Sequence, residues 1–501
     1  MTRDHVARAG HPLHVRCSVV RNAEVSALPG IKHVVLLMLE NRSFDNVLGW
    51  LYENERPNHH SPALKPGEPE YHGLSGKSLT NKVRWRNGVE ETVPITKADK
   101  SKGLTLPLGL PGEEWMHVNR QVFGREFSPG KPPTQADTAD MSGFLEDFHA
   151  CCTAFSDMVK KLGQTPEDLR VRMKKHLGID VGNFRLLEFN EGAEREYTLR
   201  MMQTYTPEQL SVLNGLARNF AVSDQWFASV PSQPNTNRAF SLCGTASGLV
   251  DNDNDNPFHT NTLFNVLFNC GDSNWAIYHH NPWPPNQHTQ SCYTRYQFEA
   301  LSRIPKVQEH LRPIGVFFEQ ARRGEPCRAC PTWNPPGANP TGSSAMTITP
   351  PPAHLGAGEE FLKQVYEALS KNRDMWAETL LIVTFDEHGG LFDHVPPPWD
   401  TKRPDEVVDF GEKGHGFLFD RFGVRVPTLL VSPRIRPGTV FRSPTEVPYG
   451  HTSLLKTILA WRGIDVSGGV LGARAARAPS FSEVLETEVV QSEPVPIERW
   501  R

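Results

Sequence analysis

One stretch of the chain decides the fold: residues 33–45, with the sequence HVVLLMLENRSFD. Its unbroken apolar run from Val34 to Leu39 begins with two β-branched residues, which predicts a strand buried on both faces. A polar turn and a helix-like segment follow the run. Chemistry in parallel α/β sheets is located beyond the carboxyl ends of strands, where Glu40 and Asn41 stand. A carboxylate and an amide oxygen at that place form half of a site for a hard cation.

A second stretch repeats this design near the other end of the chain: residues 380–390, with the sequence LLIVTFDEHGG. A buried strand is again predicted, and Asp386 and Glu387 follow it. Adjacent carboxylates repel each other and lose solvation, and a bound cation offsets both costs. Each stretch alone is equally compatible with a solvated loop, because short motifs have a high false-positive rate. The two together, with His388 and His394 close by, favour a metal site.

These two stretches resemble the signatures of a known family. ENRSFD at residues 40–45 and FDEHGGLFDHVPPP at residues 385–398 are similar to the two signatures of the bacterial phosphoesterase family that contains phosphatidylcholine-type phospholipases C and the related acid phosphatase. The likeness runs in order from about residue 33 to residue 458. It implies an α/β fold, a three-layer α/β/α sandwich of the alkaline-phosphatase type with loop and helical insertions. It also implies cleavage of phosphate esters by a hydroxyl nucleophile with one bound divalent metal ion.

The resemblance also implies a set of site residues. The expected metal ligands are Glu40, Asn41, Asp386 and Glu387. The residues expected to be catalytic are Thr236, His279, His280 and His388, and those expected to bind substrate are Asn237, Arg238, His394 and His451. Hard oxygen ligands allow calcium, magnesium or manganese, and the nearby histidines leave zinc and iron open. On spacing alone, the adjacent histidines at 279 and 280 have a site role in only a minority of cases.

Three positions depart from the family pattern. Pro234 stands where the family has the nucleophilic Thr or Ser, four residues before Arg238, and a prolyl ring cannot attack phosphorus. Thr236 is the expected replacement, and Ser232 is the second choice. Glu113 and a residue near Pro350 stand where the family often has histidines, for which the downstream histidines at 117 and 354 are possible substitutes.

Two classes of function therefore remain open. The first is hydrolysis of phosphate esters, with a phospholipase C-type phosphodiesterase ahead of an acid phosphatase that cleaves monoesters. The second is a catalytically impaired homologue that binds metal and phosphate without turnover, which Pro234 favours. The expected partner is a phosphate-ester substrate, with phospholipids among the candidates. Nothing in the sequence indicates an oligomeric state.

Composition narrows the class of protein. The chain has 501 residues and a formal net charge of −4, which argues against a nucleic-acid binder driven by bulk charge. No apolar run approaches the roughly 18–20 residues of a membrane span. The first residues have charges without a following apolar segment, so we expect a cytoplasmic protein or one exported without a recognisable signal peptide. The eight cysteines are too few for a disulfide scaffold in a chain of this length.

Pro- and Gly-rich segments suggest how the chain is divided. We expect one large catalytic domain over residues 29–465, preceded by an N-terminal arm at 1–28 and followed by a C-terminal tail at 466–501. Three insertions are expected within the domain, at about 53–110, 155–190 and 324–353.

Overall fold

The two predicted strands lie side by side at the centre of a sheet. β1 (His33–Leu39) and β12 (Thr379–Phe385) run parallel, with His33 opposite Thr379 and Leu39 opposite Phe385. β12 is buried along its whole length and β1 along all but its first residue. Because the two strands end level with each other, the polar residues that follow them emerge at the same edge of the sheet. Both strand predictions are confirmed.

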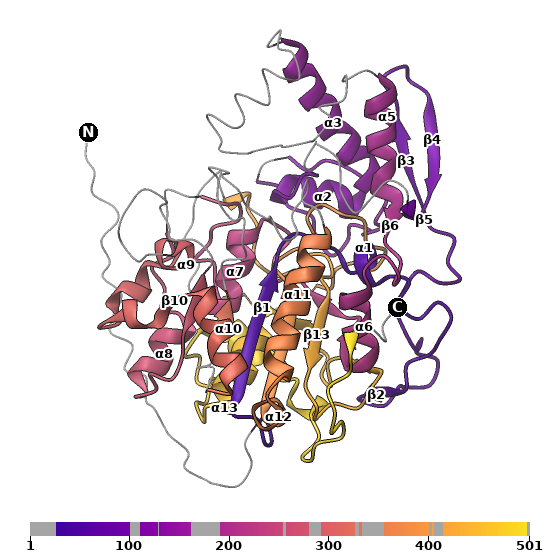
Figure 1. Ribbon diagram of the computed structural model, residues 1–501. Coiled ribbons are helices and arrows are strands. Elements are labelled where there is room, and N and C mark those ends of the chain that lie inside the picture. Colours follow the sequence, from indigo (N-terminus) through magenta and orange to yellow (C-terminus); the bar gives the residue numbers. More distant parts are fainter. Residues whose placement is uncertain are drawn as a thin grey trace, which may run out of the picture.

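The computed structural model describes residues 27–100, 111–128, 130–161, 191–253, 257–279, 292–325, 330–332, 355–399, 403–404 and 414–497. Within these ranges the central sheet has seven strands in the order β11-β1-β12-β13-β7-β14-β2 (Figure 1). The remaining strands of the sheet are β2 (His59–Ser61), β7 (Ala221–Ser223), β11 (Cys330–Thr332), β13 (Thr428–Val431) and β14 (Thr439–Phe441). β13 is antiparallel to both of its neighbours, and the other neighbouring strands are parallel.

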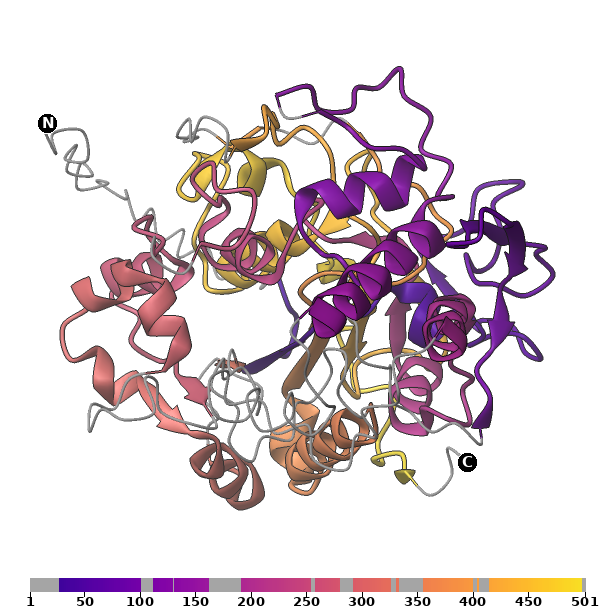
Figure 2. The same ribbon diagram turned by 90° about the horizontal axis from the view of Figure 1, so that it is seen from above.

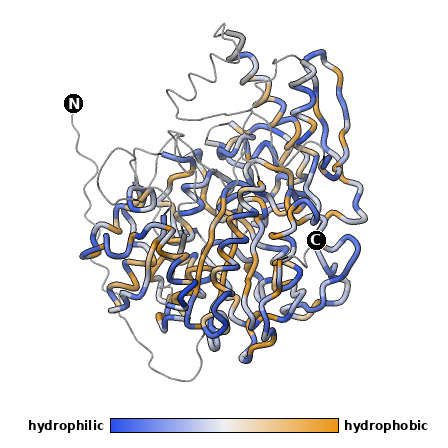
Figure 3. Tube along the Cα trace, in the orientation of Figure 1, coloured by the Kyte–Doolittle hydropathy of each residue, from blue (hydrophilic) through white to orange (hydrophobic). Residues whose placement is uncertain are grey.

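Helices cover both faces of this sheet, so the predicted three-layer α/β/α arrangement is confirmed (Figure 2). One layer consists of α6 (Ser211–Asn219), α10 (Ile314–Arg323), α11 (Leu355–Ser370) and α12 (Arg373–Ala377). The other contains α7 (Pro234–Cys243), α13 (His451–Trp461) and α14 (Gly472–Arg477), with α8 (Leu263–Asn269) against α13. Hydrophobic residues are concentrated in the strands and in the inner faces of these helices (Figure 3), which is where burial stabilises a layered fold.

A smaller unit sits above the carboxyl edge of the sheet (Figure 1) and has its own hydrophobic cluster. It is built from the hairpin of β3 (Thr80–Arg84) and β4 (Glu90–Pro94) with α2 (Trp115–Phe123), α3 (Phe144–Lys161) and α5 (Glu191–Leu199). β5 (Thr96–Lys97) and β6 (Gln203–Thr204) pair at its base, near α1 (Phe44–Leu48). The unit therefore covers the edge at which Glu40 and Asp386 emerge.

The expected insertions are more closely tied to the core than the sequence suggested. β2, from the first insertion, pairs with β14 and forms one edge of the main sheet. β11, from the third, pairs with β1 and forms the other edge. Residues 326–329 and 333–353 of the third insertion and residues 162–190 of the second lie outside the described residues, as does nearly all of the N-terminal arm. The C-terminal segment packs on the sheet layer, where Gln491 donates a hydrogen bond to the carbonyl of Ile435.

Shorter elements complete the fold around the site. β9 (Ile277–His279) pairs with β10 (Leu311–Pro313) in a separate two-stranded sheet, and β15 (Tyr449–Gly450) pairs with β8 (Trp226–Phe227). α9 (Tyr293–Gln297) lies close to α7 through a hydrogen bond from the Tyr293 hydroxyl to Asn235. A search of the described helices finds none with the length and apolar character needed to cross a membrane. Among the cysteines, Cys270 is disulfide-bonded, and four others are free thiols: Cys151, Cys152, Cys243 and Cys292.

Candidate active site

The two signature loops interlock at the edge of the sheet. The backbone N–H of Asn41 donates to Oδ1 of Asp386 over 3.0 Å, and the backbone N–H of Arg42 donates to the carbonyl of Glu387 over 3.1 Å. Asn41 has a φ of 59°, which is uncommon for a residue other than glycine and often marks a functional site. Gly389, at φ +66°, lets the loops meet, because a Cβ there would lie 2.6 Å from the carbonyl oxygen of Asn41.

All four predicted metal ligands are therefore brought together and buried. Asp386 and Glu387 are inaccessible to solvent, and Glu40 and Asn41 are buried too. Arg238, from α7, reaches across the cluster: its Nη2 donates to Oδ2 of Asp386 over 2.7 Å and also to Oε1 of Glu40. Arg238 was expected to bind substrate, and it does reach the site, but in this structure its charge is directed at two of the ligands.

Glu113 is a further member of the cluster that the sequence-based ligand set omits. Its Oε2 accepts a 2.5 Å hydrogen bond from Nδ2 of Asn41. Burial and the neighbouring Glu387 and Asp386 raise the pKa of Glu113 well above its usual range. His117, considered as a substitute for a histidine at position 113, points elsewhere, toward Asp147. The position that departs from the family pattern thus supplies a carboxylate to the site.

The electrostatics of the cluster fit a divalent cation. Burial and Glu40 raise the pKa of Asp386 to about 6 against the opposing effect of Arg238, and burial with the adjacent Asp386 raises the pKa of Glu387 well above normal. Two buried oxygens, Oδ1 of Asn41 and Oε1 of Glu387, have no hydrogen-bond partner among the described residues. Unsatisfied buried oxygens are costly and rare, so they point to an ion that would be their partner. The donor set is all oxygen, as hard cations prefer.

His388 and His451 lie beside the cluster and use ring nitrogens on protein partners. Gln121 directs its Nε2 at two acceptors, the carbonyl of Gly112 and Oδ2 of Asp147, so its Oε1 faces Nε2 of His388 over 2.8 Å and that nitrogen is the donor. Burial lowers the pKa of His388 to about 3. In this arrangement the ring is neutral and its proton is held by Gln121, and the catalytic role of His388 stays a prediction.

His451 is likewise a positioning residue, because both ring nitrogens bind the protein. Its Nδ1 accepts from Nε1 of Trp226 over 3.4 Å, so its Nε2 donates to the carbonyl of Asp386 over 2.6 Å. Burial lowers its pKa to about 4. The expectation that the His451 side chain binds substrate is thus not met. The predicted position of His451 at the start of α13 is confirmed. From there its hydrogen bond holds the backbone of Asp386, a candidate metal ligand.

His394 belongs to a different cluster. Its Nδ1 lies 2.6 Å from Oδ2 of Asp45, and its Nε2 lies 2.7 Å from Nζ of Lys77. The guanidinium of Arg425 binds Asp45 over 3.0 Å and Asp393 over 2.9 Å in the same place. Both ring nitrogens of His394 are engaged by an acid and a lysine, away from the acid cluster, and its substrate-binding role stays a prediction.

Thr236 and Asn237 are also placed differently from the prediction. Residues two apart on a helix point to opposite sides, so Thr236 faces away from Arg238 and from the acids. Its hydroxyl is buried and donates to the carbonyl of Gln233 over 2.8 Å. The side chain of Asn237 holds the preceding loop, accepting from the N–H of Val230 and donating to the carbonyl of Ser232. Both side chains are thus engaged with the loop before α7, and their predicted roles stay predictions.

A hydroxyl better placed for chemistry precedes the helix. α7 begins with Pro234 at its first position, where the missing N–H costs nothing, and Ser232 lies just before the N-cap residue. Oγ of Ser232 donates to Oδ1 of Asp251 over 2.9 Å, and Oδ2 of Asp251 lies 2.9 Å from Nε2 of His415. Burial acts to raise the pKa of Asp251, but hydrogen bonds from His415 and its other donors outweigh burial and lower the pKa.

The group of Ser232, Asp251 and His415 is connected to the acid cluster by the short segment of chain that follows Glu113. The backbone N–H of Trp115, two residues further on, donates to Oδ1 of Asp251 over 2.7 Å, and the Trp115 ring stacks on His415. His279 ends β9 and is buried, and its predicted catalytic role stays a prediction. His280 lies outside the described residues.

The layered fold and the buried oxygen donors at the ends of two parallel strands define an α/β protein with a hard-cation type of site at the carboxyl edge of its sheet. The chain belongs to the Phosphoesterase family, whose model matches residues 31–464. It is a hydrolase that acts on phosphoric ester bonds.

Relatives by sequence include plant and bacterial proteins. Non-specific phospholipase C4 of Arabidopsis thaliana is 29% identical over 470 residues, which cover 91% of this chain and 72% of that protein. Non-hemolytic phospholipase C of Burkholderia pseudomallei is 28% identical over 282 residues, which cover 49% of this chain and 39% of that protein. With plant proteins among the relatives, the likeness does not indicate a bacterial source.

Solved structures give weaker matches. A protein of the alkaline phosphatase superfamily from Vibrio parahaemolyticus aligns over 50% of this chain and 60% of its own, with 12% identity and a TM-score of 0.26. A lipoteichoic acid synthase from Listeria monocytogenes aligns over 54% of this chain and 69% of its own, with 13% identity and a TM-score of 0.28. At these scores the matches add nothing to what the sheet and its helical layers already show.

Proposed function

We propose that this chain is a metal-dependent phosphodiesterase of the phospholipase C type that acts through the hydroxyl of Ser232. One observation carries the metal dependence: the buried cluster contains four carboxylates and one arginine, and Asn41 Oδ1 and Glu387 Oε1 have no partner among the described residues. Glu40, Asn41, Glu113, Asp386 and Glu387 would hold the ion. When bound, a divalent ion there would offset charge on the phosphate oxygens and lower the pKa of an attacking hydroxyl.

The nucleophile follows from the start of α7. Phosphate is bound favourably at a helix N-terminus, because unpaired N–H groups and the helix dipole meet it there. Ser232 is the hydroxyl at this end, and Asp251 orients it, is ionised at neutral pH and can accept its proton. The Ser232 Oγ–phosphorus bond forms as the bond from phosphorus to the leaving oxygen breaks. That oxygen takes a proton from a pocket acid, for which His279 stays the prediction, and water then cleaves the phosphoserine.

A phospholipid substrate is supported by the names of the relatives, which are phospholipases C. The oxygen-rich donor set favours calcium, magnesium or manganese. Two histidines lie close to the acids: His388 in the second motif and His451 at the start of α13. Each already binds a protein partner with a ring nitrogen. That arrangement weakens the case for zinc or iron in this cluster.

The test is hydrolysis of a chromogenic phosphodiester and the matching monoester, with calcium, magnesium and manganese screened and phosphatidylcholine vesicles as a third substrate. Ser232→Ala and Thr236→Ala form a matched pair on either side of the helix start. We expect Ser232→Ala to lose turnover by several orders of magnitude and Thr236→Ala to retain most of it. Full activity of Ser232→Ala would sink the nucleophile assignment.

The substrates separate the remaining alternatives. Preference for the diester and release of diacylglycerol from vesicles support the phospholipase C type, whereas preference for the monoester supports a phosphatase. Absence of turnover with every metal, despite metal binding that Asp386→Ala abolishes, would move the impaired homologue to first place.

A further inference from the structure

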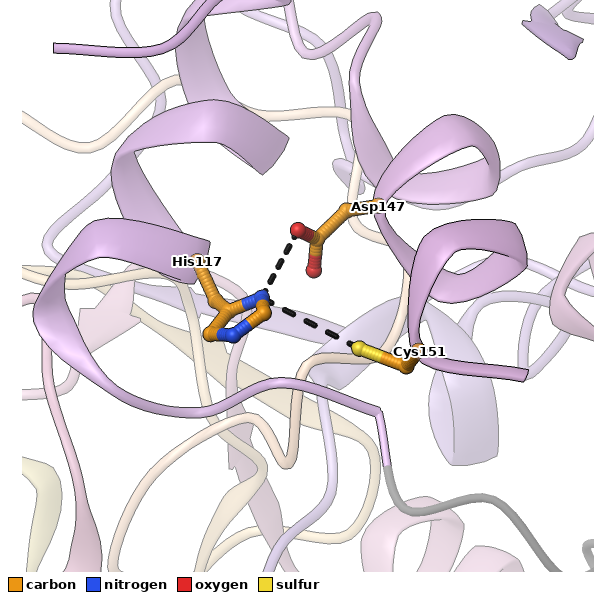
Figure 4. A group of neighbouring side chains, drawn as sticks. All are labelled: His117, Asp147 and Cys151. Carbon is orange, nitrogen blue, oxygen red and sulfur yellow. Dashed lines mark hydrogen bonds and ion pairs between the residues drawn. The ribbon is translucent and has the colours of Figure 1, made fainter. Parts of the chain in front are cut away.

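A second group of metal-binding side chains lies between α2 and α3, apart from the acid cluster. His117 comes from α2, and Asp147 and Cys151 come from one face of α3, four residues apart (Figure 4). Nδ1 of His117 lies 2.8 Å from Oδ1 of Asp147 and 3.9 Å from Sγ of Cys151. One ligand atom from each residue lies within 4.8 Å of the other two. An imidazole, a carboxylate and a thiol therefore converge on one point.

The group is held in place by residues around it. Asp147 is buried, and its Oδ2 accepts a 2.8 Å hydrogen bond from Nε2 of the buried Gln121, which leaves Oδ1 to face the histidine and the thiol. The imidazole lies directly over Gly112, where a Cβ would be only 2.1 Å from Cγ of His117. Any other residue at position 112 would displace the ring, so the glycine reserves its place.

A plain ion pair explains only part of this geometry. The hydrogen bond that His117 donates to Asp147 and the contact with Cys151 raise the pKa of His117 to about 11, and Nδ1–H has a single proton to donate. The ion pair between His117 and Asp147 uses that single proton. It does not explain why the thiol of Cys151 faces the same nitrogen. A cation at the meeting point contacts all three ligand atoms, and a thiolate with a carboxylate matches the charge of a divalent ion.

We propose that His117, Asp147 and Cys151 form a second metal site, which binds a zinc-class transition-metal ion. Sulfur and imidazole ligands select this class and distinguish the site from the all-oxygen cluster at the sheet edge. The metal takes the places of the protons on Nδ1 and on the thiol, which are released on binding. His117 is 37% exposed on its side chain and Cys151 is partly exposed, so solvent can supply the fourth ligand. Oε2 of Glu114, 3.9 Å from Nε2 of His117, is the nearest carboxylate for the other ring nitrogen.

The site has a direct connection to the phosphoesterase cluster. The amide of Gln121 binds Asp147 with its nitrogen and His388 with its oxygen, and His388 is adjacent to Glu387. A metal that fixes Asp147 would therefore also fix the side chain that orients His388. The proposal itself does not depend on the proposed function, because it rests on the geometry of three residues outside the acid cluster.

The experiment is a titration of the metal-free, reduced full chain with Co²⁺, a spectroscopic substitute for zinc. We expect a thiolate-to-cobalt charge-transfer band, because the proposed site is the one place in the described part of the chain where a thiol lies beside two further ligand side chains. Cys151→Ser should abolish the band, and the matched control Cys152→Ser, one residue along the same helix, should keep it. An Asp386→Ala chain should also keep it, which separates this site from the acid cluster.

A second measurement uses the unaltered thiol and does not depend on how the serine variant folds. Zn²⁺ should protect Cys151 from alkylation by iodoacetamide in the wild-type chain, and His117→Gln should weaken this protection by more than about 100-fold, since second-shell changes alone cost about 10–100-fold. A charge-transfer band that persists in Cys151→Ser, or alkylation of Cys151 at the same rate with and without Zn²⁺, would overturn the proposal.

Discussion

Two clusters of buried acids follow the same two sequence motifs, and they are built in opposite ways. The first contains the carboxylates of Glu40, Glu113, Asp386 and Glu387 and the amide of Asn41, and it leaves one oxygen of Asn41 and one of Glu387 without partners among the described residues. The second contains Asp45 and Asp393, and Arg425 lies between them with all of its nitrogens engaged. Arg425 also lies 4.4 Å above the ring of Phe44.

The two clusters also differ in the direction in which the pKa values of their acids are shifted. Burial acts to raise the pKa of Asp386 and Glu387 in the first cluster and of Asp45 and Asp393 in the second. In the second, Arg425 and His394 outweigh burial and lower the pKa of Asp45, although the pKa of its neighbour Asp393 is raised by burial. In the first, the single Arg238 cannot balance four carboxylates, and the pKa of Asp386 rises to about 6. A buried acid cluster that contains its own cation is structural, whereas one with surplus charge is suited to bind an ion.

Removing an acid from the first cluster gives the largest expected effect. We expect Asp386→Asn to reduce metal-dependent turnover by at least about 10²–10³-fold, comparable to the loss of one key electrostatic group in an active site. Because the carboxylate is unfavourable there without a metal, metal-free Asp386→Asn should be at least as stable at pH 7 as the metal-free wild type. Activity assays and denaturant unfolding check both expectations.

The second cluster supplies the contrast for that measurement. Asp45→Asn should lower the unfolding free energy, since Asp45 is paired with Arg425 over 3.0 Å. The comparison between the clusters fails when Asp386→Asn and Asp45→Asn change stability in the same direction.

Removing the internal cation tests the second cluster directly. Arg425→Met should destabilise the chain by about 3–5 kcal/mol, because it leaves buried carboxylates without a partner. Asp45, Asp393 and His394 already lie close enough to act together as metal ligands, and the substitution removes the cation between them. In an Asp386→Asn background, added Mn²⁺ should therefore raise the melting temperature of the Arg425→Met chain and leave that of the Arg425 chain unchanged. Equal responses would show that Arg425 does not serve as the cluster's cation.

A single half-buried acid outside both clusters shows the effect of lost solvation without a cation. Glu359 accepts from the backbone N–H groups of Val212 (2.6 Å) and Leu213 (3.0 Å) at the start of α6, and burial raises its pKa from 4.5 to about 7. A raised pKa means that its contribution to stability is present below pH 4.5 and is lost as the pH rises through 7.

We therefore expect the wild type to lose up to about 3 kcal/mol relative to Glu359→Gln between pH 4.5 and pH 8. Urea unfolding of both proteins across this range measures the difference. Parallel pH profiles would contradict the raised pKa.

The smallest expected effect concerns how closely the two motifs approach in the first cluster. An alanine at position 389 would have to adopt a φ of +66°, and its Cβ would lie against the carbonyl of Asn41. We therefore expect Gly389→Ala to lower the unfolding free energy by about 1–3 kcal/mol and to weaken metal binding. Gly67→Ala is the matched control, because Gly67 has a φ of +84° and nothing within 4 Å of a Cβ. Equal losses in the two variants would mean that the close approach of the loops contributes nothing.

Much of the site was predictable because it follows directly from strands. A buried strand has a strong local pattern, and its end fixes where the next side chains go, so Glu40, Asn41, Asp386 and Glu387 could be predicted to meet. The roles of His388, His394 and His451 could not be predicted in this way. Whether a histidine faces a substrate or an internal partner depends on Gln121, Asp45 and Trp226, which are distant in sequence.

The proposed nucleophile is a second example of a role that the sequence pattern alone does not fix. Counting back from Arg238 led to Pro234, with Thr236 as the first replacement and Ser232 as the second, whereas the proposal of Ser232 rests on its place just before the start of α7 and on its hydrogen bond to Asp251. Glu113, Asp251 and His415 had no motif of their own. A Glu within a Pro- and Gly-rich loop, an Asp in a polar run and a His between two glycines all look like surface residues in the sequence.

The sequence by itself therefore determined the central strands, the three-layer class of fold, the family and the four oxygen donors, since each depends on local patterns or on motifs that follow strands. Only the tertiary structure decided which acids have a cation and which lack one, which hydroxyl stands at the start of α7, and that His117 meets Asp147 and Cys151. The physical reason is that the charge balance of a buried group depends on every side chain around it, and those neighbours are brought together only when the chain folds.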